Sequence, residues 1–367
     1  MNNIELIFPE IFISLSIMFL LILGVFKKDS SKIIHNISLL VLLITAVITF
    51  NETLSISPTT LFNESIIIDY LSSFMKIITL LAAFVVLLIS SNYLRTFKIF
   101  KIEYPILILS SVLGMMIMIS SNDLIVFYMG LELQSLALYV LATFNRDQLK
   151  SSEAGLKYFV LSALSSGLLL YGCSLIYGFT GSTNFNVIST QFNTNEYAIT
   201  FGIVFILVGL AFKISAVPFH MWAPDVYEGS PTSVTLFFTM VPKIAALTVF
   251  IRFLYVPFLN LIDQWQMILV FLSIASMLFG AIAAIGQKNL KRLIAYSSIS
   301  HIGYALAGLA TGSNEGIQSS VIYMTIYIIM NLGFFSCLLM MKRNNEYYES
   351  IDDLSGLSKN HPLLSLS

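Results

Sequence analysis

The sequence predicts an all-α protein, a polytopic membrane helix bundle with about eleven transmembrane helices. Of its 367 residues, 57% are hydrophobic and only 11% are charged, whereas soluble domains carry about 25% charged residues. Apolar runs of membrane-spanning length recur along the chain, and basic residues gather in alternate connections between them. We therefore expect the lipid bilayer to surround the chain, and the net charge of -1 gives no indication of nucleic-acid binding.

Each predicted span contains about 20 mostly apolar residues, which is the length that crosses a bilayer. The spans must be helical, because an isolated strand in lipid leaves its backbone groups unpaired. The first lacks a preceding basic segment and a small-residue cleavage site, so it is expected to remain as a helix. In order, the spans are roughly 8–26, 33–50, 66–91, 104–120, 123–144, 152–179, 200–220, 232–254, 265–286, 291–310 and 316–341. Residues 361–367 resemble the start of another apolar run, which indicates a fragment.

The basic residues of the connections predict the orientation. Of 19 lysines and arginines, fourteen follow spans one, three, five, nine and eleven, and one, Arg252, lies on the opposite side. Basic connections stay in the cytoplasm, so the N-terminus is expected outside and the tail in the cytoplasm or its organellar equivalent. The fourteen are Lys27, Lys28, Lys32, Arg95, Lys98, Lys101, Arg146, Lys150, Lys288, Lys291, Arg292, Lys342, Arg343 and Lys359.

Three titratable residues lie deep in predicted spans. Glu132 is about 14 Å from the start of its helix at about 1.5 Å per residue, close to the bilayer middle. Lys213 and Lys243 are similarly deep, and each such charge costs about 2.5–3.5 kcal/mol if it faces lipid. We expect them to face the bundle interior, where they either form ion pairs that fix helix packing or exchange protons.

Lysine suits proton exchange in such a place. Burial lowers the pKa of a lysine by up to about 3–5 units and a nearby carboxylate raises it again, so a small movement can release or bind a proton near neutral pH. A metal site is not expected, because ammonium groups are not ligands and no cluster of His, Cys or Asp accompanies them. The two cysteines, Cys173 and Cys337, lie in apolar runs and are expected to pack as free thiols.

Two further lysines lie inside spans. Lys157 follows Glu153 by four residues, a favourable helical ion pair, and is either a proton-transfer group or an interfacial lysine. Lys76 lies near the outer end of its helix, about two turns from Asp69, and is expected to be structural.

Two prolines accompany the deep lysines. Pro218 frees the carbonyl of Ile214, beside Lys213, and Pro242 frees the carbonyl of Phe238, beside Lys243. Broken membrane helices are tolerated where the freed groups line protein or water. We expect a helix break beside each lysine, which admits polar backbone and water, or otherwise an ordinary proline kink.

Histidines and acids near these positions are accessory candidates. His220 follows the predicted break, and His301 lies among hydroxyls, so each is either a proton relay or a hydrogen-bonded core residue. The hydroxyl residues around His301 are Ser297, Ser298, Ser300 and Tyr304. Asp225 and Glu228 are either proton-uptake groups or members of a solvated loop.

Five motifs carry a family resemblance: GLELQSLALYVL, EAGLKYFVLSALSSGLLLYG, FKISAVPFHMWAPDVYEGSPTSVTLF, PKIAAL and QKNLKRLIAYSSISHIGY. The chain resembles the antiporter-like membrane subunits of respiratory complex I, most closely the subunit N family, called subunit 2 in mitochondria. The resemblance covers residues 1–367 and is most specific over 123–310.

The resemblance implies a function and a set of residues. It implies a proton-translocating, non-redox subunit of NADH:quinone oxidoreductase that assembles with other membrane subunits. It also implies that the chain binds no cofactor of its own, while NAD and quinone are used elsewhere in the complex. The family's proton-transfer residues correspond to Glu132, Lys157, Lys213, Lys243 and His301, with His220, Pro218 and Pro242 as accessory residues.

The resemblance also implies an architecture. Two inverted five-helix repeats with a broken seventh helix are expected, in a family of about fourteen helices, so the chain is expected to be truncated. The expected units are an N-terminal three-helix segment 1–103, a first repeat 104–256 and an incomplete second repeat 265–367.

The mechanism that follows takes protons from the cytoplasm to Lys213 and through water to Lys243, with Glu132 and Lys157 as a charge switch. Two alternatives remain: a subunit of a multi-subunit Na+(K+)/H+ antiporter, and an assembly scaffold with inert ion pairs. The expected location is a bacterial cell inner membrane, with the mitochondrial inner membrane as the alternative.

Overall fold

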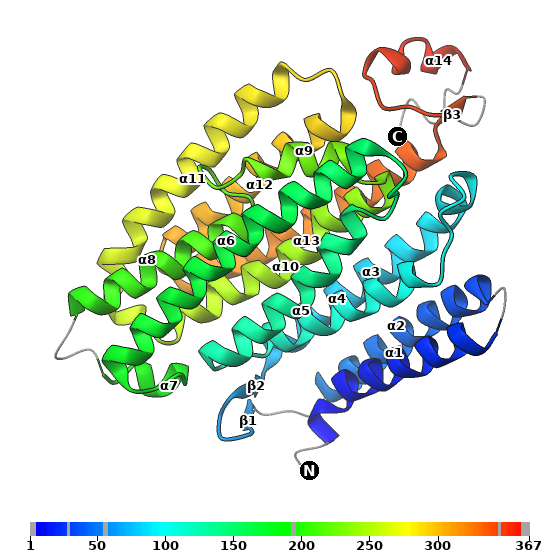
Figure 1. The fold of residues 1–367 in the computed structure, drawn as a ribbon. Helices are drawn as coiled ribbons and strands as arrows, with labels where there is room; N and C mark the ends of the chain where they lie inside the picture. Colours follow the sequence, from blue (N-terminus) through cyan, green and yellow to red (C-terminus); the bar gives the residue numbers. More distant parts are fainter. Residues whose placement is uncertain (1–4, 28–29, 54–57, 192–195, 344–345, 361–367) are drawn as a thin grey trace.

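The computed structural model describes residues 5–27, 30–53, 58–191, 196–343 and 346–360. Lys28, which contributed to the predicted orientation, and the run 361–367 lie outside these residues. Figure 1 shows long helices that run in broadly the same direction, with α1 and α2 at one edge and α11 at the opposite edge.

Each of the predicted spans corresponds to one long helix. These helices are α1 Phe8–Phe26, α2 Ser31–Thr53, α3 Tyr70–Thr96, α4 Glu103–Ile119, α5 Leu124–Ala142, α6 Leu149–Thr180, α8 Glu196–Lys213, α10 Thr232–Tyr255, α11 Ile262–Ile285, α12 Leu290–Ala310 and α13 Asn314–Met340. Within the described residues, nine helices are long and apolar enough to cross a membrane, while α4 and α8 are shorter apolar helices. The all-α membrane bundle is therefore confirmed.

Short elements connect these helices. They are η1 Glu5–Ile7, α7 Phe185–Ile188, α9 Trp222–Gly229, η2 Leu259–Leu261, η3 Asp352–Leu354, α14 Leu357–Asn360, and the strands β1 Thr59–Leu61, β2 Ile66–Ile68, β3 Lys342–Arg343 and β4 Glu346–Tyr347. Each strand pair forms an antiparallel two-stranded hairpin, β1 with β2 and β3 with β4. Neither pair was predicted from the sequence: β1 and β2 lie between α2 and α3, and β3 and β4 follow α13.

Capping residues explain where several helices begin. The third span was predicted from residue 66, but α3 begins at Tyr70, because Asp69 and Ser72 form a capping box at its start. The residues just before it form β2 instead. Asp123 likewise caps α5 by accepting hydrogen bonds from the backbone of Ile125 and Val126.

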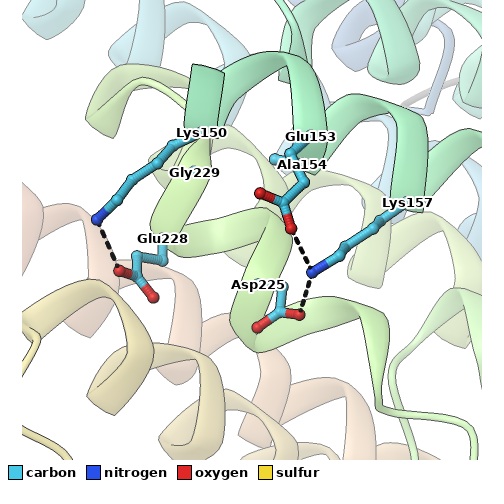
Figure 2. Close-up of a pocket in the computed structure, with 7 residues that line it drawn as sticks. All are labelled: Lys150, Glu153, Ala154, Lys157, Asp225, Glu228 and Gly229. Carbon is cyan, nitrogen blue, oxygen red and sulfur yellow. Dashed lines mark hydrogen bonds and ion pairs between the residues drawn. The ribbon is translucent and has the colours of Figure 1, made fainter. Parts of the chain in front are cut away.

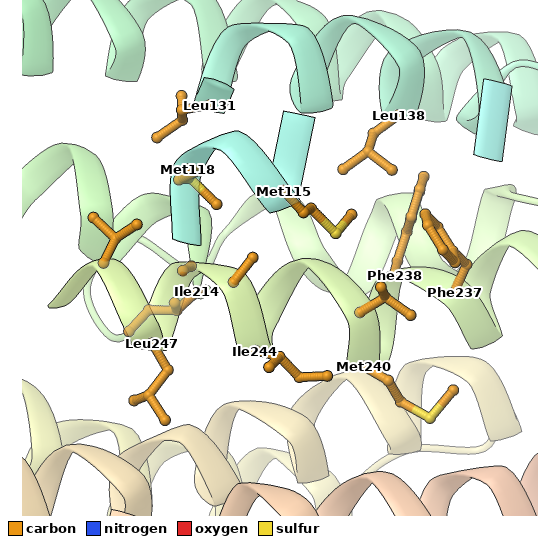
Figure 3. Close-up of a cluster of buried hydrophobic side chains, with 14 of the residues drawn as sticks. Met115, Met118, Leu131, Leu138, Ile214, Phe237, Phe238, Met240, Ile244 and Leu247 are labelled. Atoms are coloured by element: carbon orange, nitrogen blue, oxygen red, sulfur yellow. The ribbon is translucent and has the colours of Figure 1, made fainter. Parts of the chain in front are cut away.

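Helix α10 is the central element of the bundle. Residues 232–254 are all buried, and α10 packs against α3, α4, α5, α8, α9, α12 and α13. Figure 3 shows part of this core, in which Met115 of α4 and Leu138 of α5 lie on the side of α10 that carries Phe238, and Ile244 lies on its other side. A polar side chain on α10 is therefore enclosed by protein.

The seventh span is broken, as predicted, and the break begins earlier than expected. Helix α8 ends at Lys213, where a helix through residue 220 was predicted, and α9 begins at Trp222. Ser215 has a φ of 59°, so the helix cannot continue through it. The Nε1 group of Trp222 donates to the Phe212 carbonyl at 2.9 Å, and the Val217 amide donates to Ser276 Oγ at 2.9 Å. Neighbouring protein groups thus satisfy the interrupted backbone.

The predicted break at Pro242 is wrong. Helix α10 continues through this proline, and the hydroxyl of Tyr227 donates to the freed carbonyl of Phe238 at 3.3 Å. Because a buried side chain satisfies this carbonyl, the helix tolerates the proline without interruption.

Candidate functional site

Lys213 occupies the end of α8 and is buried, with 7% of its surface exposed. Its Nζ donates to Ser135 Oγ at 2.9 Å and to Ser162 Oγ at 2.7 Å. The C-terminal end of a helix carries partial negative charge, which stabilises a cation there. The break that ends α8 therefore gives Lys213 a favourable electrostatic position inside the bundle.

A tyrosine completes the contacts around Lys213. Tyr139 Oη donates to Ser162 Oγ at 2.6 Å, and Lys213 Nζ lies 6.0 Å from the centre of the Tyr139 ring. The sequence analysis missed Ser135, Ser162 and Tyr139. A signal existed for two of them, because Ser135 and Tyr139 follow Glu132 by three and seven residues, which places all three on one helix face.

Glu132 lies on α5 beside this cluster and is partly buried. It acts on Lys213 electrostatically. Its Oε1 atom is buried and has no hydrogen-bond partner among the described residues. Among the described residues, Glu132 forms no hydrogen bond or ion pair with the ammonium group of Lys213.

Lys157 lies near the N-terminal end of α6, where its side chain is 43% exposed. It forms ion pairs with Glu153 at 2.8 Å and with Asp225 at 3.0 Å (Figure 2). The predicted pairing with Glu153 is confirmed. Glu132 is not among the ion-pair partners of Lys157, so the two residues of the predicted charge switch are not a single ion pair in this structure.

The ion pairs of Lys157 belong to a larger cluster that holds α9. Arg292 of α12 pairs with Asp225 at 2.7 Å and with Glu228 at 3.0 Å. Lys150 of α6 pairs with Glu228 at 3.3 Å. Figure 2 shows Asp225 and Glu228 of α9 facing the α6 side chains across a shallow cleft. Together these contacts fasten the short helix beyond the break between α6 and α12.

The pKa values of the two α9 carboxyl groups indicate their role. Burial raises the pKa of Asp225, but Lys157 and Arg292 lower it more, so it lies below its ordinary value. The pKa of Glu228 is likewise lowered by Arg292 and Lys150 against the effect of burial. Both groups are therefore ionised at neutral pH, which suits ion pairs that hold α9 better than groups that take up protons.

Lys243 lies at the centre of the bundle on α10, with 1% of its surface exposed. Its Nζ donates to Ser298 Oγ of α12 at 2.8 Å and lies 5.7 Å from the centre of the Tyr227 ring. Like Lys213, it is held by a hydroxyl and not by a carboxylate. The prediction that both deep lysines face the bundle interior is confirmed.

His301 follows Ser298 by one helical turn, so both side chains lie on the same face of α12. Its Nδ1 is 2.7 Å from Tyr323 Oη of α13, and its ring centre is 5.0 Å from that of Tyr327. The sequence analysis proposed hydroxyl neighbours from the same helix. The hydrogen-bond partner of the ring comes instead from the next helix, which sequence spacing cannot reveal.

Comparison with known proteins decides the family. The family described as NADH:quinone oxidoreductase/Mrp antiporter, TM, matches residues 121–367. The chain is 76% identical over 367 residues to NADH-quinone oxidoreductase subunit N of Pelagibacter ubique (strain HTCC1062), a match that covers 100% of this chain and 78% of that protein. This chain belongs to the subunit N family. It is also 51% identical over 362 residues to subunit N of Parvibaculum lavamentivorans, covering 97% and 74% of the two chains.

Chains of three solved membrane complexes are similar to this chain in structure. A chain of respiratory complex I from Thermus thermophilus with bound aureothin matches with a TM-score of 0.82 and 30% identity, covering 98% of this chain and 76% of that one. A chain of an archaeal membrane-bound sulfane sulfur reductase matches with a TM-score of 0.87 and 25% identity, covering 100% and 76%. A chain of the Mrp complex from Dietzia sp. DQ12-45-1b matches with a TM-score of 0.86, 23% identity and coverage of 100% and 70%, which establishes a common fold alone.

His220, one of the accessory residues predicted for this chain, follows the helix break. Its ring centre lies 4.6 Å from that of Phe279 on α11, and its buried Nδ1 has no hydrogen-bond partner among the described residues. Pro218 lies in the break itself. A relay role for His220 stays a prediction.

Lys76 is another buried lysine, and its partner differs from those of Lys213 and Lys243. Lys76 pairs with Glu10 of α1 at 2.5 Å, while Asp69, its expected neighbour, pairs with Arg252 at 2.6 Å. The close contact with a carboxylate supports the structural role predicted for this lysine.

Metal and thiol chemistry add nothing to this site. The described residues contain no group of three or more His, Cys, Asp or Glu side chains that could hold a metal ion. Cys173 is buried and Cys337 is partly buried.

Proposed function

We propose that this chain is the proton-translocating subunit N of an NADH:quinone oxidoreductase. It assembles with the other membrane subunits of that complex, and NADH oxidation and quinone reduction take place in other subunits. The chain itself binds no cofactor. Its identity of 76% and 51% to two bacterial subunit N proteins supports this assignment.

The observation that carries the proposal is how the two deep lysines are held. Lys213 and Lys243 are buried, yet their hydrogen-bond acceptors are serine hydroxyls. An ion pair that only fixes helix packing needs a carboxylate in contact, as Glu10 contacts Lys76. A lysine held by neutral groups has a protonation equilibrium that a distant charge such as Glu132 can shift.

Protons enter from the cytoplasmic side of the bundle. Protons reach Lys213 at the helix break, pass through water to Lys243, and continue to Ser298 and His301. Helices α8 and α10, which carry the two lysines, pack against each other. Glu132 changes the charge near Lys213, and Lys157 belongs to the cluster that holds α9 in position.

The arrangement in the membrane follows from the same assignment. The three-helix segment 1–103 precedes a first repeat, 104–256, and part of an inverted second repeat, 265–367. The distribution of basic residues supports an N-terminus outside the membrane. The bacterial relatives support a bacterial inner membrane as the location.

An antiporter subunit of the Mrp type is the second candidate. The Dietzia structure matches this chain with a TM-score of 0.86, but at 23% identity the likeness concerns the fold alone. The relatives with 76% and 51% identity are subunit N proteins. The subunit N assignment is therefore favoured over the antiporter assignment.

The test replaces Lys213 or Lys243 by alanine in the complete complex, reconstituted in liposomes. Protons pumped per NADH oxidised are expected to fall by about tenfold or more, as for loss of a proton-transfer group, while the complex assembles. Lys101, which is exposed in a connection, provides a matched alanine control that leaves the ratio unchanged. Normal pumping in both buried-lysine variants would overturn the proposal.

A further inference from the structure

The two serines around Lys213 both act as hydrogen-bond acceptors. Ser135 donates its own hydroxyl proton to the Leu131 carbonyl at 2.7 Å, so its oxygen faces Lys213 as an acceptor. Ser162 Oγ accepts from Lys213 at 2.7 Å and from Tyr139 at 2.6 Å. Neither hydroxyl is exposed, since both serines have 0% of their surface accessible. The orientation of both acceptors is therefore determined by neighbouring groups.

The number of N–H bonds on Lys213 Nζ differs between its two protonation states. The ammonium form has three N–H donors, and the neutral amine has two N–H donors and one lone pair. Ser135 and Ser162 occupy two donors, which exist in both forms. Within the part of the chain that the structure describes, no third acceptor contacts Nζ. The third position on the nitrogen is thus available for a proton that arrives and leaves.

We infer that Ser135 and Ser162 are positioning residues that hold Lys213 in both of its protonation states and reserve its third nitrogen position for the transferred proton. This inference rests on the proposed function. Tyr139 supports the arrangement by fixing the orientation of Ser162. On uptake, the lone pair of Nζ forms the third N–H bond while an O–H bond of the donating water breaks. Release reverses these two changes, and no electron moves.

Neutral acceptors are what such a lysine requires. A carboxylate in contact binds the charged form far more strongly than the neutral form and would retain the proton. A hydroxyl accepts a hydrogen bond from either form. Glu132 and Tyr139 of α5 are the titratable groups that act on this position, and the free Oε1 of Glu132 keeps its charge out of direct contact with Nζ.

The test compares Ser135→Ala/Ser162→Ala with Ser166→Ala in the complete complex. Ser166 lies one turn after Ser162 on α6, is 4% exposed, and its Oγ has no hydrogen-bond partner among the described residues. Protons pumped per NADH are measured from pH 6 to 9, a range of about three units around neutral pH. In the double variant the ratio should fall, and its pH profile should move to lower pH by about one unit or more, because the ammonium loses two acceptors. Ser166→Ala should match the unmodified complex.

Two further variants keep the test decisive. If the double variant does not assemble, Tyr139→Phe, which removes one hydroxyl and keeps the ring, should move the pH profile in the same direction by a smaller amount. Ser135→Thr, which retains a hydroxyl, should pump with the original profile. If the double variant assembles and the pH profile of its pumping ratio is unchanged, the inference is overturned. Where Tyr139→Phe is used instead, an unchanged pH profile in that variant overturns it. Lys213→Ala separates this inference from the proposed function. If Lys213→Ala abolishes pumping while the serine variants pump normally, the positioning role is refuted and the proposed function is not.

Discussion

Two buried lysines in different parts of the chain have opposite kinds of partner. Lys76, in the N-terminal three-helix segment, is 3% exposed and contacts the Glu10 carboxylate at 2.5 Å. Lys213, at the helix break, is 7% exposed and contacts two serine hydroxyls. The residue type and the depth of burial are the same. The comparison indicates that partner chemistry, and not burial alone, separates the lysine that fastens helices from the lysine that we propose exchanges a proton.

The largest effect should come from breaking the Glu10–Lys76 ion pair. Glu10→Ala removes the carboxylate that contacts the buried ammonium of Lys76, and breaking a buried ion pair costs about 3–5 kcal/mol. The thermal stability of the purified complex should fall, and protons pumped per NADH should stay unchanged in the molecules that assemble. Replacing both residues, as Glu10→Leu/Lys76→Met, should restore most of the stability. A changed pumping ratio would place Lys76 among the proton-transfer groups.

Acidification should release α9 from α6 and α12. The pKa values of Asp225 and Glu228 lie below their ordinary values of 3.8 and 4.5, so their ion pairs stabilise the fold above those values. This contribution is lost as pH falls through the lowered folded-state values. The protection of the amides of residues 222–229, which is their exchange rate corrected for the pH dependence of the intrinsic rate, should therefore be high at neutral pH and lower at about pH 3.

A variant provides the control for this comparison. Asp225→Asn/Glu228→Gln removes both charges, so protection in α9 should already be low at neutral pH and should depend little on acidification. Equal protection in the variant and the unmodified chain at neutral pH would mean that the ion pairs do not hold α9.

The smallest effect should come from Lys150→Ala. This side chain is 75% exposed and pairs with Glu228 at 3.3 Å, and exposed ion pairs contribute about 0–1 kcal/mol. Neither thermal stability nor pumping should change measurably, because Arg292 still holds Glu228. A large loss of pumping would instead make Lys150 a proton-uptake group.

Much of the fold could be predicted because membrane spans are long local signals. Each predicted span is found as a helix, and the break was predicted from Pro218. The exact end of α8 could not be predicted, because it depends on contacts such as that of Trp222 with the Phe212 carbonyl. The hairpin β1–β2 was missed because its strands contain only three residues each.

The site was predictable only in part. The cost of charge in lipid indicated that Lys213 and Lys243 would be buried. Their partners were not visible, because Ser135 and Ser162 lie 78 and 51 residues from Lys213 in sequence. Those contacts exist only once α5, α6 and α8 are packed together.

Converting the surroundings of Lys213 into those of Lys76 tests the central claim most directly. Ser162→Asp places a carboxylate beside the ammonium of Lys213, which should bind the charged form and stop proton transfer. Ser162→Asn, of equal size and without charge, serves as the control. In reconstituted complex, protons pumped per NADH should fall close to zero for Ser162→Asp, with NADH oxidation continuing, and should stay clearly higher for Ser162→Asn. Pumping by Ser162→Asp equal to that of the unmodified complex would contradict the account.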